Sequence, residues 1–505
     1  MTDTTPRPPQ SGSDPEVPQV PDGGVPRTFH IRTYGCQMNE HDSEQLAGLL
    51  AAEGMVATDD VASADVVVFN TCCIRENADN KFYGHLGAVK ALRAERPDVR
   101  IAVGGCLAQL EGERIRERAD HVDVVFGTHN LARAPELLRR SASGPVVEIL
   151  QPGEGASGVA AAAGAPGGMS GGVSGGAAPS SLALTAERDV PYAAWVTIQI
   201  GCDNSCAFCI VPTVRGPEVS RPFDDLVAEV GVLAGRGVTE VTLLGQNVNS
   251  YGRDLTRRRP LFADLLRAVG SVEGIRRVRF TSPHPKDLRP ETIAAMAETP
   301  AVCNHLHLPL QSGSDRVLSA MRRGYTAARY LERLAAARSA VADLAVTTDI
   351  IVGFPGETDD EFEDTLAVVA EAGFDSAYTF IFSPRPGTRA AAMEDRFVPP
   401  EVVSERFERL RAVVERSALM RHDARVGMVE EVLVEGPSRR DRARTTGRTT
   451  QNKLVHFEPP EGESLEPGSF ATVRVTAAAP HHLVGEHVAT VSPPRHRPRI
   501  PVASA

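Results

Sequence analysis

The feature that most constrains the fold of this chain is the alternation of short apolar runs with longer helical patterns. In the first part of the chain the apolar runs are 29–34, 65–69 and 100–103, and helical patterns lie between them at 42–53 and 80–96. Strands that alternate with helices form parallel sheets, because parallel strands need a crossover connection. We therefore predict an N-terminal parallel α/β domain.

A cysteine closely follows each of these predicted strands, namely Cys36, Cys72 and Cys106. The carboxyl ends of parallel strands meet at one edge of a sheet, which is where open α/β folds place their ligands. We therefore expect these cysteines to converge, although they are far apart in sequence. The alternative is a set of unrelated buried cysteines. The repeated placement at strand ends favours convergence.

The middle of the chain repeats the same alternation. Helical patterns, for example at 223–236 and 359–372, separate the predicted strands, and a long amphipathic helix follows at 401–425. The predicted strands are 195–200, 240–244, 277–281, 305–308, 345–352 and 377–382. Such strand–helix units can close partly into a barrel, and the loops at the strand carboxyl ends then form the site. We predict a central, partial (βα)6 barrel.

A second group of cysteines, Cys202, Cys206 and Cys209, comes directly after the first strand of this barrel. The spacing is C-x3-C-x2-C, with Phe208 before the last cysteine. No fourth Cys or His lies nearby in the sequence to complete a tetrahedral zinc site, and the spacing disfavours disulfides or simple burial. Thiolates are the usual ligands of iron–sulfur clusters. Three protein ligands leave one iron of a four-iron cluster open for a substrate or cofactor.

From about residue 426 the pattern changes to short apolar runs with Gly/Pro turns, at 429–434, 454–457 and 471–475. These runs predict a small all-β domain. Between the first two runs lies an arginine cluster, composed of Arg439, Arg440, Arg442, Arg444 and Arg448. A charge run by itself is usually a solvated loop. Beside a small β-barrel, contact with an RNA backbone becomes the better interpretation.

The composition restricts the class of protein. A net charge of −11 argues against broad nonspecific binding of nucleic acid and leaves room for a local basic surface. Eight cysteines in 505 residues are too sparse for a disulfide scaffold. We find no signal peptide and no run of the roughly 20 apolar residues that a membrane span needs. We therefore expect a cytoplasmic protein that does not associate with membranes. We also expect it to be a monomer.

Composition also predicts the domain boundaries. Residues 1–26 are rich in Pro, Gly and Asp and predict a disordered tail, and residues 143–187 form a Gly/Ala-rich linker. The N-terminal domain then spans 27–142, the barrel 188–425 and the β domain 426–495.

The C-x3-C-x2-C motif resembles that of the radical S-adenosylmethionine (SAM) enzymes. Together with the N-terminal cysteines, it makes the chain similar to the methylthiotransferases, and in detail to the tRNA-2-methylthio-N6-dimethylallyladenosine synthases. The C-terminal domain resembles the RNA-binding TRAM barrel. The segments that carry the resemblance are 34–40, 70–72, 74–77, 104–106, 244–252, 307–313, 349–357 and 383–388.

The resemblance implies two [4Fe-4S] clusters and two SAM molecules per turnover. By resemblance, Cys202, Cys206 and Cys209 are the catalytic ligands of the radical-generating cluster. A second cluster, which supplies or carries the inserted sulfur, is implied at Cys36, Cys72 and Cys106. Gly245 and Gln246 stand where related enzymes hold the amino group of SAM, and a simple turn is the competing explanation. Ser312 is a weaker candidate for a ribose contact.

The implied partner is tRNA that carries N6-isopentenyladenosine next to the anticodon, and the product is its 2-methylthio derivative. The sequence identifies neither the electron donor nor the sulfur donor. A close alternative is methylthiolation of threonylcarbamoyl-adenosine in tRNA or of a ribosomal protein, although residues 37–40 favour the isopentenyl substrate. A remote alternative is a non-catalytic iron–sulfur protein that binds RNA.

Some residues depart from the family pattern or have a simpler explanation. Cys73 replaces the usual Ser, and we expect it to be a packing or spare thiol, because adjacent residues of an extended chain point in opposite directions. Residues 213–216 read Thr-Val-Arg-Gly in place of the commoner Tyr-Thr-Arg-Gly. His305 and His307 share one face of a strand, where a hydrogen-bonded core histidine is the expected role.

Overall fold

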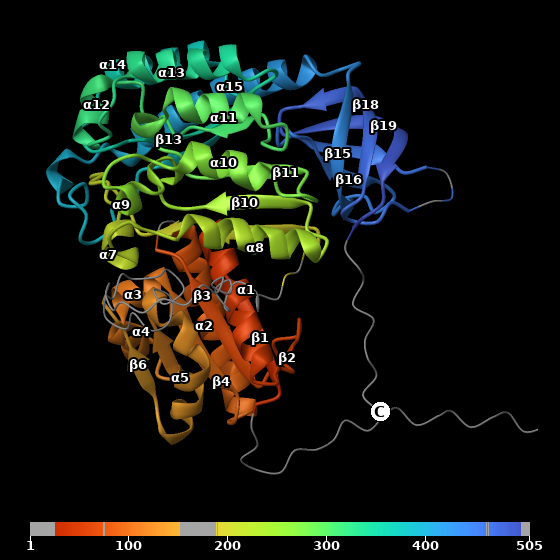
Figure 1. Ribbon diagram of the computed structural model, residues 1–505. Coiled ribbons are helices and arrows are strands. Elements are labelled where there is room, and N and C mark those ends of the chain that lie inside the picture. The colour runs from red at the N-terminus through yellow and green to blue at the C-terminus, as the bar shows by residue number, and fades with distance from the viewer. Residues whose placement is uncertain are drawn as a thin grey trace, which may run out of the picture.

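The computed structural model describes residues 26–73, 76–151, 188, 190–460, 462 and 464–495. The predicted tail at 1–26 lies, except for its last residue, outside the described residues, and so does most of the predicted linker. Figure 1 shows an N-terminal α/β unit below a central α/β core, with a β-barrel beside the core. None of the helices in the described part of the chain combines the length and apolar character that crossing a bilayer requires.

The N-terminal unit is a parallel sheet with strand order β2-β1-β3-β4-β5-β6, which confirms the predicted parallel α/β fold. The strands are β1 (Thr28–Thr33), β2 (Val56–Ala57), β3 (Val66–Thr71), β4 (Arg100–Gly105), β5 (Val124–Phe126) and β6 (Val146–Glu148). The helices are α1 (Gln37–Ala52), α2 (Glu76–Glu95), α3 (Cys106–Glu111), α4 (Glu113–Arg118) and α5 (Ala134–Arg140). Strand β6 extends this unit beyond the predicted boundary at residue 142. A strand of three residues is too short to show a periodic pattern.

The core contains two parallel three-stranded sheets, β11-β10-β7 and β12-β13-β14, joined by a β-bridge between Val278 and Val302. This arrangement confirms the partial barrel. The strands are β7 (Ala193–Thr197), β10 (Glu240–Leu244), β11 (Arg277–Phe280), β12 (His305–His307), β13 (Ala345–Val352) and β14 (Ser376–Ile381). The predicted first strand, 195–200, is in fact two strands. Its second half, β8 (Gln199–Ile200), leaves the barrel and pairs with β9 (Val219–Ser220).

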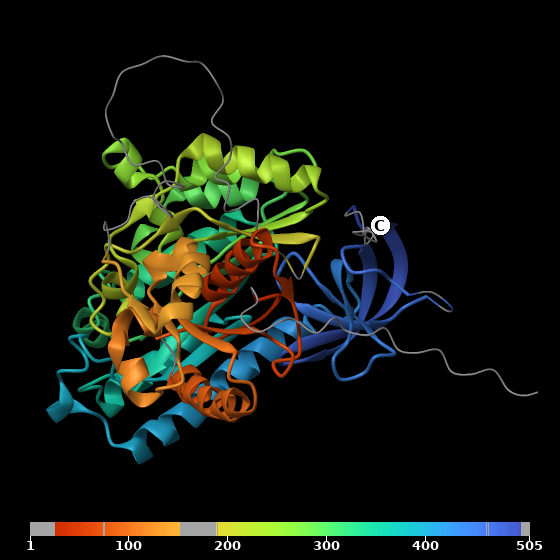
Figure 2. The ribbon, with the colours of Figure 1, turned by 90° about the horizontal axis from the view of Figure 1, so that it is seen from below.

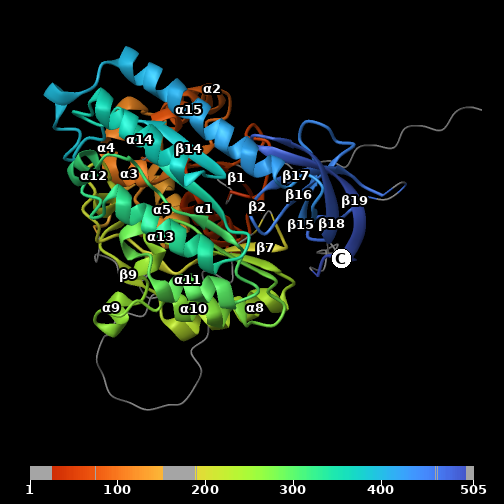
Figure 3. The same cartoon turned by 90° about the horizontal axis from the view of Figure 1, so that it is seen from above.

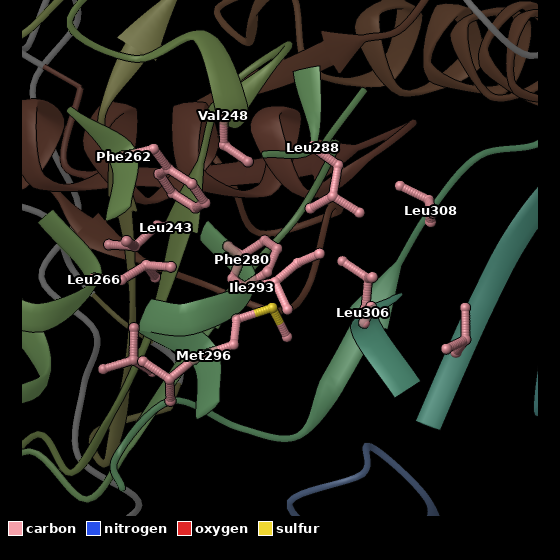
Figure 4. Packing of buried hydrophobic residues seen from close by; sticks show 14 of the residues in the cluster. Leu243, Val248, Phe262, Leu266, Phe280, Leu288, Ile293, Met296, Leu306 and Leu308 are labelled. Atoms are coloured by element: carbon pink, nitrogen blue, oxygen red, sulfur yellow. The ribbon is translucent and has the colours of Figure 1, made fainter. Parts of the chain in front are cut away.

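Side chains alternate between the two faces of each barrel strand. The outer face is apolar and packs under helices, as Figure 4 shows for Leu243, Phe262, Phe280 and Met296. The covering helices are α8 (Phe223–Gly235), α10 (Phe262–Gly270), α11 (Pro290–Glu298), α13 (Ala327–Ala340) and α14 (Asp359–Ala372). In β13 the outward-facing Val346 and Ile350 are fully buried, whereas Thr347 and Asp349, on the opposite face, are polar and only half-buried. The inner face of the barrel is therefore not filled by an apolar core.

The C-terminal unit is a closed five-stranded barrel with strand order β15-β16-β17-β19-β18, which confirms the predicted small β domain. Its strands are β15 (Val429–Pro437), β16 (Thr445–Arg448), β17 (Leu454–Glu458), β18 (Phe470–Ala479) and β19 (His482–Ser492). Strand β16 was not predicted, because Thr-Thr-Gly-Arg contains no apolar residue, and neither was β19. Figure 3 shows the long helix α15 (Pro400–Asp423) running along the core towards this barrel.

Buried charged groups attach the β-barrel to the core, and Figure 2 shows the barrel standing to one side of it. Arg277 Nη1 donates to the carbonyl of Arg448 at 2.6 Å, and Arg279 Nη2 donates to that of Thr449 at 2.8 Å. Lys453 Nζ lies 2.6 Å from an oxygen of Asp375. Breaking a buried pair of this kind leaves an unpaired charge and costs about 3 to 5 kcal/mol. These contacts hold the β-barrel in a defined orientation on the core.

Candidate functional site

The loop between β8 and the short helix α7 (Val211–Arg215) contains Cys202, Cys206 and Cys209, which we call the contiguous cysteines. The loop starts at Gly201, whose φ is +75°, and a Cβ there would lie 2.0 Å from the carbonyl oxygen of Pro217. Only glycine fits this position. Cys202 N–H donates to Gly216 O at 3.1 Å and Cys209 N–H donates to Cys206 O at 3.2 Å, so the loop is folded back on itself.

The core holds this loop from two further sides. Ala207 N–H donates to Met321 O, and Ala390 N–H donates to Ala207 O. The buried guanidinium of Arg323 donates to Cys206 Sγ at 3.3 Å. Phe208 packs against the apolar cluster that contains Ala207 and Phe354, so the aromatic residue of the motif helps to fix the loop.

The chemistry of these thiols suits a metal cluster. Burial raises the pKa of Cys209 to about 12 and also raises the pKa of Cys202. Without a cation these groups stay protonated at neutral pH, and metal binding displaces their protons. Within the described residues no three Cys, His, Asp or Glu side chains converge on a single-ion site. A four-iron cluster instead bonds each cysteine to a different iron.

The dispersed cysteines lie at one edge of the N-terminal sheet. Cys36 precedes α1 after β1, Cys72 follows β3, and Cys106 opens α3 after β4. A Cβ on Gly35, whose φ is +121°, would lie 2.4 Å from Cys72 Cβ, and the thiols of Cys36 and Cys106 interact electrostatically. The structure thus brings together the ends of three strands, and the close approach at residue 35 requires glycine.

Cys73 is placed differently from our prediction. It packs in an apolar cluster, as expected, but its thiol also forms a hydrogen bond with the Cys106 thiol. This hydrogen bond lowers the pKa of Cys106, because it stabilises the thiolate. Strand β3 ends at Thr71, so the alternation expected of an extended chain no longer applies to Cys72 and Cys73.

The candidate SAM residues follow β10. Gly245 has no positive φ, and a Cβ there would lie 2.8 Å from Cγ of Gln199, so close packing rather than a left-handed turn requires glycine. Gln199 is fully buried, and its Nε2 donates to Asn247 O at 2.9 Å. Its Oε1 accepts no hydrogen bond from the described residues. A buried, unpaired acceptor next to Gly245 and the half-buried Gln246 suits the amino group of a ligand.

The weaker candidate for a ribose contact, Ser312, lies in the segment after β12. It is fully buried, and its hydroxyl lies 3.2 Å from that of Thr365 on α14. This contact attaches the segment after β12 to a helix, and the suggested ribose contact stays a prediction.

The inner face of the second sheet carries a polar cluster that sequence reasoning underrated. His305 Nε2 and His307 Nδ1 each lie 3.0 Å from Thr347 Oγ1, and His307 Nε2 lies 3.4 Å from a carboxylate oxygen of Asp349. The Tyr378 ring meets His307 edge-on and is 56% exposed. The histidines are hydrogen-bonded, as expected, but they line a partly open surface. The signal was present in β13, where the polar Thr347 and Asp349 stand two residues apart and so lie on one face of the strand.

The predicted arginine cluster divides into two parts. Arg439, Arg440 and Arg442 are exposed. Arg444 is half-buried, 3.6 Å from Asp441, and Arg448 lies on strand β16 with its Nε 2.5 Å from Glu435. Arg448 therefore belongs to the barrel, and the basic surface is limited to residues 439–444.

Each of the three units matches a known protein family or superfamily. Residues 28–127 match the family described as uncharacterized protein family UPF0004, residues 196–369 match the radical SAM superfamily, and residues 423–488 match the TRAM domain. The chain also shares its fold with TsrM, a radical S-adenosylmethionine methyltransferase from Kitasatospora setae. The TM-score is 0.51 at 13% identity, over 72% of this chain and 75% of that chain.

Two relatives cover nearly the whole chain, and both are named tRNA-2-methylthio-N(6)-dimethylallyladenosine synthase. The one from Mycobacterium marinum is 49% identical over 95% of this chain and 89% of its own length. The one from Acidothermus cellulolyticus is 52% identical over 92% of this chain and 88% of its own length. Identity of this level over this length establishes that the chain belongs to the family of tRNA-2-methylthio-N6-dimethylallyladenosine synthases.

Proposed function

We propose that this enzyme methylthiolates C2 of N6-isopentenyladenosine next to the anticodon of tRNA. The observation that carries the proposal is the presence of two separate cysteine triads in a chain about half identical to synthases of that name. One triad lies in the loop after β8, and the other lies at the edge of the N-terminal sheet. We further propose that it acts as a monomer in the cytoplasm.

Each triad has a distinct role in this proposal. Cys202, Cys206 and Cys209 hold the radical-generating [4Fe-4S] cluster, and Cys36, Cys72 and Cys106 hold the second cluster. When bound, the clusters and two SAM molecules supply one-electron chemistry, a sulfur atom and a methyl group. The protein's part is to position these groups and to exclude water from them. Gln199 Oε1, next to Gly245, is the acceptor that we assign to the amino group of SAM.

The inner face of the barrel is the site that we assign to the target base. The ring of Tyr378 is exposed there and can stack on a nucleobase, an interaction worth about 1 to 3 kcal/mol. His307 and Asp349 lie beside it and can form hydrogen bonds with the polar edge of adenine. The C2–H bond of adenine is neither acidic nor electrophilic, which is why one-electron chemistry is needed at this carbon.

The β-barrel supplies the proposed contact with the rest of the tRNA. Arg439, Arg440 and Arg442 project from the segment between β15 and β16. Because Arg277 and Arg279 attach this barrel rigidly to the core, the basic segment stays at a defined distance from the inner face. An RNA held there would present its modified base to the core in one register.

The experiment that tests the substrate offers the reduced enzyme matched tRNAs with and without the isopentenyl group. Burying five carbons is worth about 3 to 4 kcal/mol at roughly 0.8 per carbon, which predicts a preference of about two to three decades. Methylthiolation confined to the prenylated tRNA is the expected result. Equal turnover of both tRNAs, or activity only on threonylcarbamoyl-adenosine or a ribosomal protein, would reject the substrate and leave the radical chemistry in place.

A further inference from the structure

A short segment of the core runs from the contiguous triad directly into the N-terminal unit. Helix α7 starts at Val211, just after Cys209, and ends at Arg215. Ile210 and Val214 pack in the apolar cluster that also contains Cys73 and Cys106. The helix contacts α3, and Figure 1 shows it where the core meets the N-terminal unit. The core thus inserts one side of α7 into the domain that carries the other triad.

The last residue of this helix, Arg215, is buried beside the dispersed cysteines. Its Nη2 lies 2.7 Å from a carboxylate oxygen of Asp42 on α1, and the two side chains are 7% and 16% exposed. The guanidinium also interacts electrostatically with the thiols of Cys36 and Cys106. Its titratable neighbours are therefore one carboxylate, members of the triad and the imidazole of His129, all contributed by the other domain.

The charges at this place have a definite consequence. A guanidinium stays protonated in proteins, and taking it out of water is costly unless anions surround it. Asp42 supplies one negative charge. Three thiolates on a four-iron cluster add net negative charge, which increases when the cluster is reduced. A fixed cation nearby favours the reduced state, because cluster potentials respond to net charge and hydrogen bonds.

We propose that Arg215 is a positioning residue that sets the reduction potential of the cluster held by Cys36, Cys72 and Cys106. Because Arg215 comes from the core, the second cluster site is electrostatically complete only when the two domains are docked. This inference rests on the proposed function, which assigns a cluster to these cysteines.

The test uses the full chain carrying Cys202→Ala, Cys206→Ala and Cys209→Ala, so that only the dispersed triad can hold iron. In this background the midpoint potential is measured by redox titration followed by electron paramagnetic resonance, with iron content as the second readout. Arg215→Gln should shift the potential down, because it removes a positive charge. Asp42→Asn should shift it up, because it removes the opposing negative charge. The midpoint potential of Arg215→Lys should lie between those of the parent and Arg215→Gln.

Thr128→Val is the matched control, because Thr128 Oγ1 donates to Val214 O at 2.7 Å and so ties the same helix to the N-terminal unit without a charge. It should leave the potential unchanged. Opposite shifts in Arg215→Gln and Asp42→Asn support the inference, since a merely structural disturbance has no reason to change sign. If Arg215→Gln holds no iron, an upward shift in Asp42→Asn still supports it.

If both variants hold iron and their midpoint potentials equal that of the parent, the proposed role of Arg215 is wrong, while the second cluster remains in place. Absence of iron from the unsubstituted background would overturn the second cluster itself, and this inference with it. The two failures are therefore distinguishable by iron content alone.

Discussion

The two cysteine triads gather their thiols by different means. The contiguous triad takes all its thiols from one loop, 202–209, which a left-handed Gly201 and a few backbone hydrogen bonds fold back on itself. The dispersed triad takes its thiols from the ends of three strands, and the parallel sheet brings them together. A local spacing thus encodes the first triad, whereas only the topology of a whole domain encodes the second.

The triads also differ in where their buried cation comes from. Arg323, which donates to Cys206, belongs to the same domain as the contiguous triad. Arg215, beside Cys36 and Cys106, belongs to the other domain. The buried cation of the contiguous triad thus comes from the core itself, whereas that of the dispersed triad comes from across the interface between the two domains.

The largest expected effect comes from removing one triad at a time. Replacing Cys202, Cys206 and Cys209 with Ala should abolish cleavage of SAM, because no radical-generating cluster can form. Replacing Cys36, Cys72 and Cys106 with Ala should abolish methylthiolation but keep the release of 5′-deoxyadenosine. Each triple variant should retain about half the iron after anaerobic reconstitution, since each triad can hold one cluster.

Iron analysis, chromatography of the nucleoside products and a circular dichroism spectrum of each variant check this prediction. A folded variant that lost all its iron would show that the two sites are not independent. The contiguous triad could then no longer be described as a self-sufficient site.

The next effect tests the cation at the contiguous triad. Arg323→Gln removes a buried positive charge 3.3 Å from Cys206 Sγ, so the potential of the radical-generating cluster should fall. Cleavage of SAM should slow with a weak reductant and recover with a stronger one. The dispersed cluster should be unaffected, which a titration of both clusters in the same sample would show. A rate loss that no reductant repairs would indicate that Arg323 supports folding instead.

The same difference between local spacing and domain topology explains which features could be predicted from the sequence. The spacing of the cysteines around Phe208 was enough to predict the contiguous triad. The convergence of parallel strand ends was enough to predict that Cys36, Cys72 and Cys106 lie at one edge of the sheet. The expected alternation of side chains failed beyond the end of a strand: Cys73 lies beside Cys106 because β3 stops at Thr71. Long-range charge contacts left no local signal.

The pairing of Arg215 with Asp42 is such a contact, because 173 residues separate the two side chains in sequence. The pairing of Arg448 with Glu435 could have been found only by recognising β16, which has no apolar residue. Polar clusters inside the barrel are a different case. The spacing of Thr347 and Asp349 was visible in the sequence, and two polar residues on the inner face of a barrel strand predict an interior that is not wholly apolar.

A smaller effect is expected from the basic segment, which lies apart from both triads. Charge reversal at Arg440, Arg442 and Arg444 should weaken binding of tRNA. It should also reduce the slope of log affinity against log salt, by about 0.7 to 0.9 for each phosphate that the protein no longer neutralises. Iron content and SAM cleavage without RNA should not change. Charge reversal at Arg416, on α15, is the control. Unchanged affinity and slope would make the segment a solvated loop.

The smallest effect concerns the extra thiol beside the dispersed triad. Cys73 is buried in the apolar cluster and forms a hydrogen bond with Cys106, so Cys73→Ala removes packing and one weak hydrogen bond. The expected loss of stability is about 1 kcal/mol, the typical cost of a single substitution. Iron content should be unchanged, because Cys36, Cys72 and Cys106 suffice as ligands. Thermal unfolding and iron analysis, with Cys303→Ala as the matched buried cysteine, check both statements. If Cys73→Ala loses the iron of the dispersed site and Cys303→Ala does not, the dispersed group has four ligands. Its cluster would then have no open iron, unlike the cluster that we assign to the contiguous triad.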